Sequence, residues 1–225
     1  MKKLLLGNEA IARGAYEAGV RVSSAYPGTP STEINENVAT YPEIYSEWAP
    51  NEKVAVEVAL GAAVSGARSL ACMKHVGLNV AADPFFTATY TGVNAGMVVV
   101  VADDPGMHSS QNEQDTRMLA RASHAPVLDP SNSQECKDFL KLAYEISEKY
   151  DTPVILRVTT RIAHARTLVE LGERVEVPLR EYKRDIKKYV SMPANMIARH
   201  LYVEEREKKL AEDANTLPIN RIEWA

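Results

Sequence analysis

A single carboxylate opens a segment that is otherwise built from small apolar residues. Glu52 follows Asn51, and the residues from there to Ala67 are mainly alanine, valine and glycine. Taking a carboxylate out of water is costly unless a polar partner requires it, so Glu52 is a candidate for holding or passing a proton. The alternative is structural, because the free N–H groups in the first turn of any helix favour an acidic residue.

Three polar loops follow segments that read as strands, and together they could hold a small ligand. They span residues 27–31, 74–79 and 103–111. Ligands bind open parallel sheets at the carboxyl ends of the strands, so we expect the loops to share one edge near Glu52. Their two histidines are either acid–base groups or ordinary hydrogen-bonded loop residues. The candidate residues in these loops are Thr29, His75, Gly77, Asn79, His108 and Gln111.

The residue types that most often bind metals are too sparse to form a site. Asp103 and Asp104 could attract a divalent cation, but the proline and glycine that follow them are more typical of a turn. The two cysteines, Cys72 and Cys136, stand alone, without the C-x-x-C spacing of zinc or iron–sulfur sites. We therefore expect no metal ligands in this chain.

Composition and charge argue against several classes of partner. The net charge is -4 and no large basic block is present, so we expect no nucleic acid partner. The longest apolar run, residues 97–102, is far too short to cross a membrane. Asn8 and Glu9 interrupt the leucines at positions 4–6, so we expect no export signal. Lone cysteines also favour a reducing compartment, and we expect a cytoplasmic protein without membrane contact.

Helical and strand-like patterns alternate to about residue 165. The strand-like segments are short and apolar, like strands that helices bury on both faces. The alternation predicts an α/β fold with a doubly wound, mainly parallel sheet flanked by helices. We expect strands at 20–26, 45–48, 69–73, 98–102, 126–128 and 154–158. We expect helices at 7–19, 31–39, 51–67, 77–89, 112–122 and 133–149.

The composition changes after about Leu171, where arginine, lysine and glutamate become frequent. We expect residues 1–174 to form the α/β domain. Residues 175–225 then form a charged helical extension, with one amphipathic helix at 195–213 and a strand-like start at 221–223. This extension either wraps the first domain or connects it to a downstream domain that is missing from this chain.

Several runs of residues match a known family closely. Residues 25–33 (AYPGTPSTE) resemble the Y-P-x-T-P-S-S segment of 2-oxoacid:ferredoxin oxidoreductases. Asn51-Glu52-Lys53 resembles the start of the glutamate helix of thiamine enzymes. Residues 73–81 (MKHVGLNVA) and 102–115 (ADDPGMHSSQNEQD) are similar to the α subunits of the indolepyruvate-using branch of that family. The resemblance is good over residues 7–166 and looser in the tail.

The resemblance implies the pyrimidine-binding domain for thiamine diphosphate. In this family a glutamate hydrogen-bonds N1′ of the aminopyrimidine ring and so activates the cofactor, a role that falls to Glu52. By position, Thr29 lies on the substrate side, and His75, Gly77 and Asn79 approach the cofactor. His75, His108 and Gln111 are further substrate-pocket candidates. Asp103 stands where pyruvate-using relatives have an arginine that would bind a small oxoacid's carboxylate, which fits a bulkier arylpyruvate.

The resemblance also implies a larger assembly than this chain. The family oxidises and decarboxylates a 2-oxoacid to acyl-CoA and carbon dioxide, with coenzyme A as co-substrate and ferredoxin as electron acceptor. This chain has neither the G-D-G motif of the diphosphate/Mg²⁺ domain nor a cysteine-rich cluster segment. We therefore expect the rest of the α subunit, its iron–sulfur clusters, a β subunit and homodimerisation to complete the enzyme, and this chain alone to be inactive.

Two other interpretations stay open from the sequence. One is the pyrimidine-domain subunit of a split, non-redox, thiamine-dependent 2-oxoacid decarboxylase. The other is an assembly domain that binds no cofactor, which gives no reason for a glutamate at a buried helix start. In a thiamine enzyme, the small residues at 51–67 and 77–89 would permit close helix packing across a subunit interface.

Overall fold

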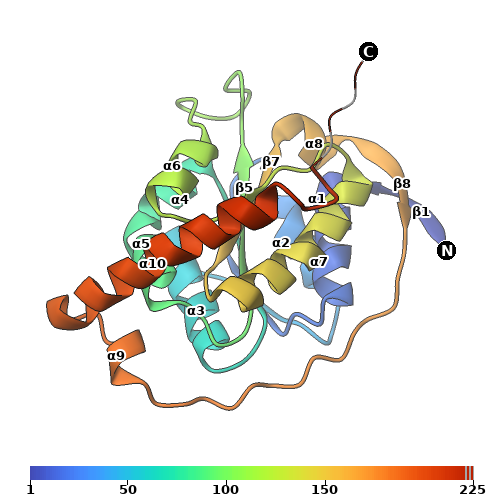
Figure 1. The fold of residues 1–225 in the computed structure, drawn as a ribbon. Coiled ribbons are helices and arrows are strands. Elements are labelled where there is room, and N and C mark those ends of the chain that lie inside the picture. Colours follow the sequence, from blue (N-terminus) through green and yellow to red (C-terminus); the bar gives the residue numbers. More distant parts are fainter. Residues whose placement is uncertain (221, 223, 225) are drawn as a thin grey trace.

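Six parallel strands form the central sheet of the molecule (Figure 1). The computed structural model describes residues 1–220, 222 and 224. The strand order is β3-β2-β4-β5-β7-β6, and each neighbouring pair is parallel. The strands are β2 (Val22–Ala25), β3 (Tyr45–Trp48), β4 (Ser69–Lys74), β5 (Met97–Asp103), β6 (Val127–Leu128) and β7 (Val154–Thr159). The predicted doubly wound α/β fold is confirmed, and the six expected strands lie at their predicted places.

Helices cover both faces of this sheet (Figure 1). Asn51 and Asn132 begin two of the long ones, and each side-chain oxygen accepts a hydrogen bond from a backbone N–H of the first turn at 3.0 Å. The helices are α1 (Gly7–Glu17), α2 (Thr32–Val38), α3 (Glu52–Val64), α4 (His75–Val80), α5 (Ala82–Thr91), α6 (Thr116–Ala122), α7 (Ser133–Tyr150), α8 (Thr160–His164), α9 (Ile186–Tyr189) and α10 (Pro193–Ala214).

Residues of the central strands alternate between two hydrophobic cores, one on each face of the sheet. Leu70 and Cys72 of β4 join the core formed with α1 and α7. Ala71 and Met73 join the core formed with α3, α4 and α5. Since successive side chains of a strand point to opposite faces, helices on both faces bury every residue of β4. This double burial fixes β4 and β5 as the rigid centre from which the loops of the site extend.

Two of the expected helices differ in the structure. The helix predicted at 77–89 is instead two helices, α4 and α5, which meet at Ala81. Pro84 lies in the first turn of α5, where a missing N–H is tolerated, so it begins a new helix rather than continuing one. The helix predicted at 112–122 begins only at Thr116. Asp115 caps it by accepting a hydrogen bond from the Arg117 N–H at 3.0 Å.

The small residues of α3 pack inside this chain. Ala59 and Ala63 are fully buried in the same core as Ala81 and Phe85, and α3 contacts both α4 and α5. The sequence had suggested the small residues at 51–67 and 77–89 for a subunit interface, which stays a prediction; the buried Ala59 and Ala63 pack within the chain. Homodimerisation stays a prediction.

An antiparallel ribbon joins the two ends of the α/β region, and the sequence did not predict it. β1 (Lys2–Leu6) pairs with β8 (Arg166–Glu170), from Lys2 opposite Glu170 to Leu6 opposite Arg166. Leu5 is buried in the core, whereas Leu4 and Leu168 are exposed. The leucines at positions 4–6 are therefore a strand of the fold.

The C-terminal segment folds back onto the α/β domain. Residues 171–185 run along the surface as an extended segment without helix or strand before α9 and α10 (Figure 1). Val175 N–H donates to the Glu17 carbonyl at 3.0 Å, and Arg180 N–H donates to the Gly66 carbonyl at 3.0 Å. The helix expected at 195–213 lies within α10. Residues 221 and 223 of the expected strand-like start lie outside the described residues, and the boundary at 174 stays a prediction.

One carboxylate holds both C-terminal helices to the domain. Asp151 Oδ1 accepts hydrogen bonds from the Val93 N–H and from Lys188 Nζ of α9, both at 2.8 Å. Its Oδ2 accepts one from Arg199 Nη2 of α10 at 3.2 Å. The backbone carbonyl of Asp151 also accepts from Arg206 Nη1 at 3.0 Å. Arg206 is a buried residue of α10, so Asp151 anchors both C-terminal helices.

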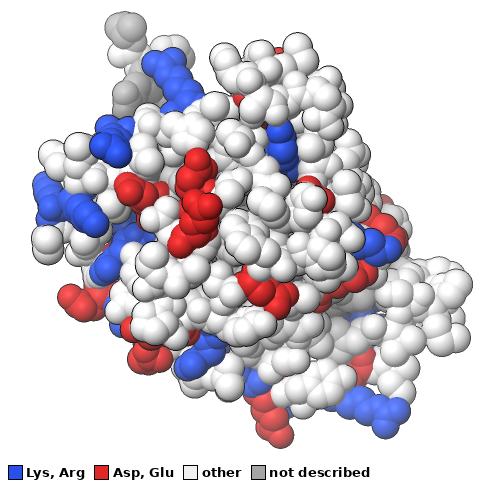
Figure 2. Space-filling view, turned by 180° about the vertical axis from the view of Figure 1, so that it is seen from behind, with Lys and Arg blue, Asp and Glu red and all other residues white. Residues whose placement is uncertain are grey.

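The charged surface has no single sign. Figure 2 shows acidic and basic side chains interspersed over the face opposite to that of Figure 1. Among the described helices, none combines the length and the apolarity needed to cross a bilayer. Within the described residues, no cluster of three or more histidine, cysteine or acidic side chains is placed to hold a metal ion.

We predict that Asp151→Asn lowers the free energy of unfolding by about 1–3 kcal/mol, because it removes the charge that faces Lys188 and Arg199. Asparagine tolerates the left-handed backbone of this position, where φ is 53°. Urea unfolding measures the loss, and limited proteolysis should show earlier cleavage within residues 186–214. Asp83→Asn is the matched control, since that carboxylate is exposed and pairs only loosely with Lys53 at 3.5 Å. Equal stabilities of the two variants would contradict the anchoring role.

Candidate functional site

The three loops named from the sequence meet at the carboxyl edge of the sheet. Lys74 Nζ, at the end of β4, donates a hydrogen bond to the Ser109 carbonyl at 3.1 Å. Ser109 Oγ in turn donates to the Thr29 carbonyl at 3.3 Å. Gly28 lies against Lys74, because a Cβ at Gly28 would come within 3.0 Å of Lys74 Cδ. Direct contacts thus join the loops after β2, β4 and β5.

Glu52 lies beside this junction and has no hydrogen-bond donor among the described residues. It is the first residue of α3 and is only 8% exposed. A Cβ at Gly77 would come within 2.7 Å of Glu52 Oε1, so the carboxylate lies directly over Gly77. Asn51 already caps the helix by accepting from the Val54 N–H. Asn51 is therefore the N-cap residue of α3, and Glu52 lies in its first turn. Glu57, on the same helix, is exposed.

His75 is buried without a polar partner. It begins α4, is 1% exposed, and neither ring nitrogen has a hydrogen-bond partner among the described residues. Burial lowers the pKa of His75, while the nearby Asp103 charge opposes the shift in part. The imidazole is therefore neutral at pH 7. Buried polar atoms are nearly always hydrogen-bonded, so two unpaired ring nitrogens indicate a place for a ligand.

Asp104 organises the loop after β5. Burial raises the pKa of Asp104, but hydrogen bonds from the Ser109 N–H, Ser110 Oγ and Thr160 Oγ1, each 2.8 Å long, outweigh it. The result is a pKa held well below the usual range. The Met107 N–H also donates to the Asp104 carbonyl at 2.9 Å and closes the expected turn. Asp104 is thus a structural acceptor.

Asp103 is neutralised inside the domain. Its carboxylate accepts hydrogen bonds from Arg157 Nε at 2.7 Å and from the Thr116 N–H at 3.1 Å. Arg157 also pairs with Asp129 at 2.8 Å. Asp103 therefore stabilises the contact between β5, β7 and α6. The sequence did not predict Arg157 as its partner, because the two lie on different strands.

The remaining candidates are more exposed. Asn79 lies one turn after His75 on α4 and donates to Gln114 Oε1 at 2.8 Å. Thr29 is exposed at the loop junction. His108 and Gln111 lie on the exposed part of the 104–111 loop, where His108 lines an open cavity of about 490 Å³ with Thr160. The structure therefore joins Glu52, Gly77, His75 and Thr29 to one edge, and places His108 and Gln111 at its outer part.

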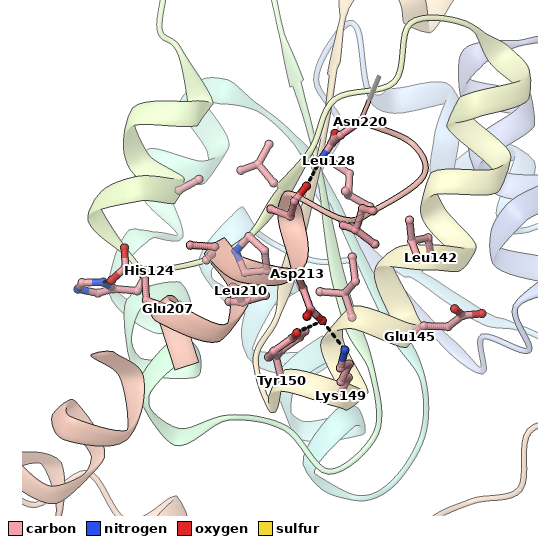
Figure 3. Close-up of a pocket in the computed structure, with 18 of the residues that line it drawn as sticks. His124, Leu128, Leu142, Glu145, Lys149, Tyr150, Glu207, Leu210, Asp213 and Asn220 are labelled. Atoms are coloured by element: carbon pink, nitrogen blue, oxygen red, sulfur yellow. Dashed lines mark hydrogen bonds and ion pairs between the residues drawn. The ribbon is translucent and has the colours of Figure 1, made fainter. Parts of the chain in front are cut away.

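A second hollow lies elsewhere, beneath α10. It is an apolar groove of about 470 Å³ between α6, β6, α7 and α10. Figure 3 shows Lys149 and Tyr150 both hydrogen-bonded to Asp213 at its rim, and Leu128, Leu142 and Leu210 among its walls. Its walls include none of the candidate residues. We therefore place the functional site at the sheet edge.

Comparison with known proteins identifies the family. The family model described as pyruvate flavodoxin/ferredoxin oxidoreductase, thiamine diphosphate-binding, matches residues 13–215. The chain belongs to this family. The resemblance inferred from residues 25–33, 73–81 and 102–115 is thereby confirmed.

Named relatives refine this assignment. The chain is 51% identical to the indolepyruvate oxidoreductase subunit IorA of Pyrococcus horikoshii over 231 residues, which is 99% of the chain and 36% of that protein. It is 31% identical to the 2-oxoglutarate synthase subunit KorA of Methanothermobacter thermautotrophicus over 180 residues, covering 76% of the chain and 48% of that subunit. The chain thus spans about a third of the first relative. The split-decarboxylase alternative is not favoured.

A solved structure shares the fold. The 2-oxoglutarate:ferredoxin oxidoreductase from Magnetococcus marinus, with 2-oxoglutarate, coenzyme A and succinyl-CoA bound, matches with a TM-score of 0.76. The match covers 94% of this chain and 45% of that chain at 19% sequence identity. At this identity the similarity supports the fold alone.

The residues at the sheet edge fit the aminopyrimidine part of thiamine diphosphate. Such a ring needs an acidic partner at one nitrogen and further polar contacts. The Glu52 carboxylate accepts no hydrogen bond from the described residues. It lies directly over Gly77, which has no side chain to displace it. His75, two residues before Gly77 on α4, adds two ring nitrogens that have no partner among the described residues.

We predict that the stability of the domain falls as the pH drops below about 6.5, the ordinary pKa of histidine, and that His75 causes part of the fall. The folded state lowers the pKa of His75, so below 6.5 the unfolded chain binds the proton more readily and is favoured. Urea unfolding of the wild type and of His75→Gln at about pH 7.5 and 5.5 measures this contribution. His164→Gln, at an exposed position, is the control. Parallel pH dependences of wild type and His75→Gln would contradict the prediction.

Proposed function

We propose that this chain is the N-terminal pyrimidine-binding domain of a thiamine diphosphate-dependent arylpyruvate (indolepyruvate):ferredoxin oxidoreductase. The buried Glu52 carboxylate, which lies over Gly77 without a donor, is the observation that carries the proposal. Identity of 51% to a subunit named for indolepyruvate, against 31% to one named for 2-oxoglutarate, supports the aryl substrate. We infer that the complete enzyme works in the cytoplasm.

The chemistry assigned to this chain is positioning and proton exchange. Thiamine diphosphate, when bound, supplies the carbanion chemistry that removes carbon dioxide from a 2-oxoacid. Glu52 would hold a proton at N1′ of the pyrimidine ring in a site with little water. Neutral His75 can accept or donate a hydrogen bond without adding charge there. Thr29, Gly77 and Asn79 complete the proposed cofactor side, whereas Thr29, His75, His108 and Gln111 form the proposed substrate side.

Other parts of the enzyme would complete the reaction. The products proposed are acyl-CoA, carbon dioxide and reduced ferredoxin. The diphosphate/Mg²⁺ domain, the iron–sulfur clusters and a β subunit would come from outside this chain, which spans 36% of its first relative. We expect homodimerisation of the assembly and no ferredoxin reduction by residues 1–225 alone. Residues 175–225 would connect to the rest of the α subunit.

We predict that Glu52→Gln lowers the turnover of the assembled enzyme by at least about 100-fold, because glutamine keeps the shape but cannot exchange the proton. Ferredoxin reduction with indolepyruvate and coenzyme A measures turnover, and calorimetry measures thiamine diphosphate affinity. Glu57→Gln is the matched control on the same helix, since Glu57 is exposed. Full turnover of Glu52→Gln would overturn the proposed function.

Gly77→Ala tests whether the Glu52 carboxylate needs the space that Gly77 leaves free. The added Cβ would lie 2.7 Å from both Cγ and Oε1 of Glu52, so the carboxylate must move. We expect thiamine diphosphate affinity to fall about 10-fold or more, since a charge-assisted hydrogen bond is lost or bent. Gly61→Ala in α3 is the control, because a Cβ there meets nothing within 4 Å. If both variants bind the cofactor equally well, Glu52 does not contact it from this position.

A further inference from the structure

A lysine outside the proposed machinery lies between two of the site loops. Lys74 is the last residue of β4 and is only 8% exposed. Its methylene groups pass over Gly28, with Cδ 3.0 Å and Cγ 3.2 Å from the position of a Gly28 Cβ. Its ammonium group donates to the Ser109 carbonyl at 3.1 Å. The backbone of both loops therefore fixes the position of the charge.

This buried ammonium has no counter-ion among the described residues. Two other buried cations do have one, since Lys137 pairs with Glu17 at 3.3 Å and Arg157 pairs with Asp103 at 2.7 Å. The buried Arg206 of α10 instead donates to the Asp151 carbonyl. A buried charge is costly unless it is paired. An ammonium group has three N–H donors, and Lys74 uses one of them on Ser109. Two donors are left for an anion that the described chain does not supply.

Two acidic side chains at the end of β5 are already engaged. Asp103 binds Arg157 and Thr116, and Asp104 accepts from the hydroxyl groups of Ser110 and Thr160. Neither forms an ion pair with Lys74 in the described structure. Glu52, beside the same junction, forms no ion pair with Lys74 among the described residues either. The Lys74 ammonium group is therefore free to meet an anionic ligand.

We propose that Lys74 Nζ binds the carboxylate of the 2-oxoacid substrate. This inference rests on the proposed function and deepens it, because it names the group that orients the substrate. Lys74 directly precedes His75, and its contact Ser109 is hydrogen-bonded to Thr29. A carboxylate held there would lie beside the residues assigned to the substrate side. Asp103, at the end of β5, stands where pyruvate-using relatives have an arginine, and Arg157 neutralises its charge within the domain. Lys74, at the end of the neighbouring strand β4, would supply the missing cation.

The test compares an acid with its neutral ester in the assembled enzyme. Calorimetry measures the affinity of 3-indolepropionate, an unreactive carboxylate, and of its methyl ester. We expect Lys74→Met to lower the affinity for the acid about 10- to 100-fold and to change the affinity for the ester by no more than about 2-fold. Lys74→Arg should restore part of the preference for the acid. The KM for indolepyruvate should rise with the same rank order, and thiamine diphosphate affinity should stay unchanged.

Controls separate this inference from the proposed function. Lys209→Met removes an exposed lysine of α10, which pairs only with Glu205 at 3.9 Å, and should leave all affinities unchanged. Gly28→Ala keeps the charge but displaces the lysine side chain, so it should weaken the acid even if Lys74→Met fails to assemble. An equal loss of affinity for the acid and the ester, or no loss of affinity for either, would overturn the role of Lys74. A wild type that binds no thiamine diphosphate would instead refute the proposed function.

Discussion

The parallel pairing of β2, β4 and β5 determines where chemistry can occur in this domain. Since the three strands run side by side in one direction, the loops that follow them must emerge at one edge. Helices on both faces exclude water from the strands, so a polar side chain at that edge is poorly solvated. Lys74 and His75 come directly at the end of β4, and Glu52 follows β3, which pairs in parallel with β2. All three are buried at the edge that these strands share. Glu52 and Lys74 are buried without a counter-ion, and His75 is buried without a hydrogen-bond partner, among the described residues. Their proposed chemistry follows from this.

Much of this arrangement was readable from the sequence. Short apolar strands alternating with helices predicted the sheet, and strand-following loops predicted the shared edge, because both signals are local. The glutamate at the start of a small-residue helix was also visible as an exception to its surroundings. Its position over Gly77 could not be read, since it depends on how α3 packs against α4.

Features that depend on distant pairs were not predictable. Asp103 looked like part of an acidic turn, but its structural role is to pair with Arg157. Arg157 lies two strands later in the sequence, on a strand that is adjacent in the sheet. The anchoring of α9 and α10 by Asp151 likewise joins residues that no local pattern relates. The break between α4 and α5 was missed because the predicted helix at 77–89 was continued through Pro84. Long-range electrostatics and packing supply what local patterns lack.

The ribbon of β1 and β8 has a consequence for synthesis of the chain. β1 can pair only after residue 166 has left the ribosome, so nearly the whole α/β region is translated while this strand is single. A lone strand with three successive leucines is a template for pairing with other nascent chains. Lys2 and Lys3 adjoin those leucines, and their charges would repel a second copy of the same strand. Lysines beside an apolar strand are an arrangement that disfavours such pairing until the ribbon closes.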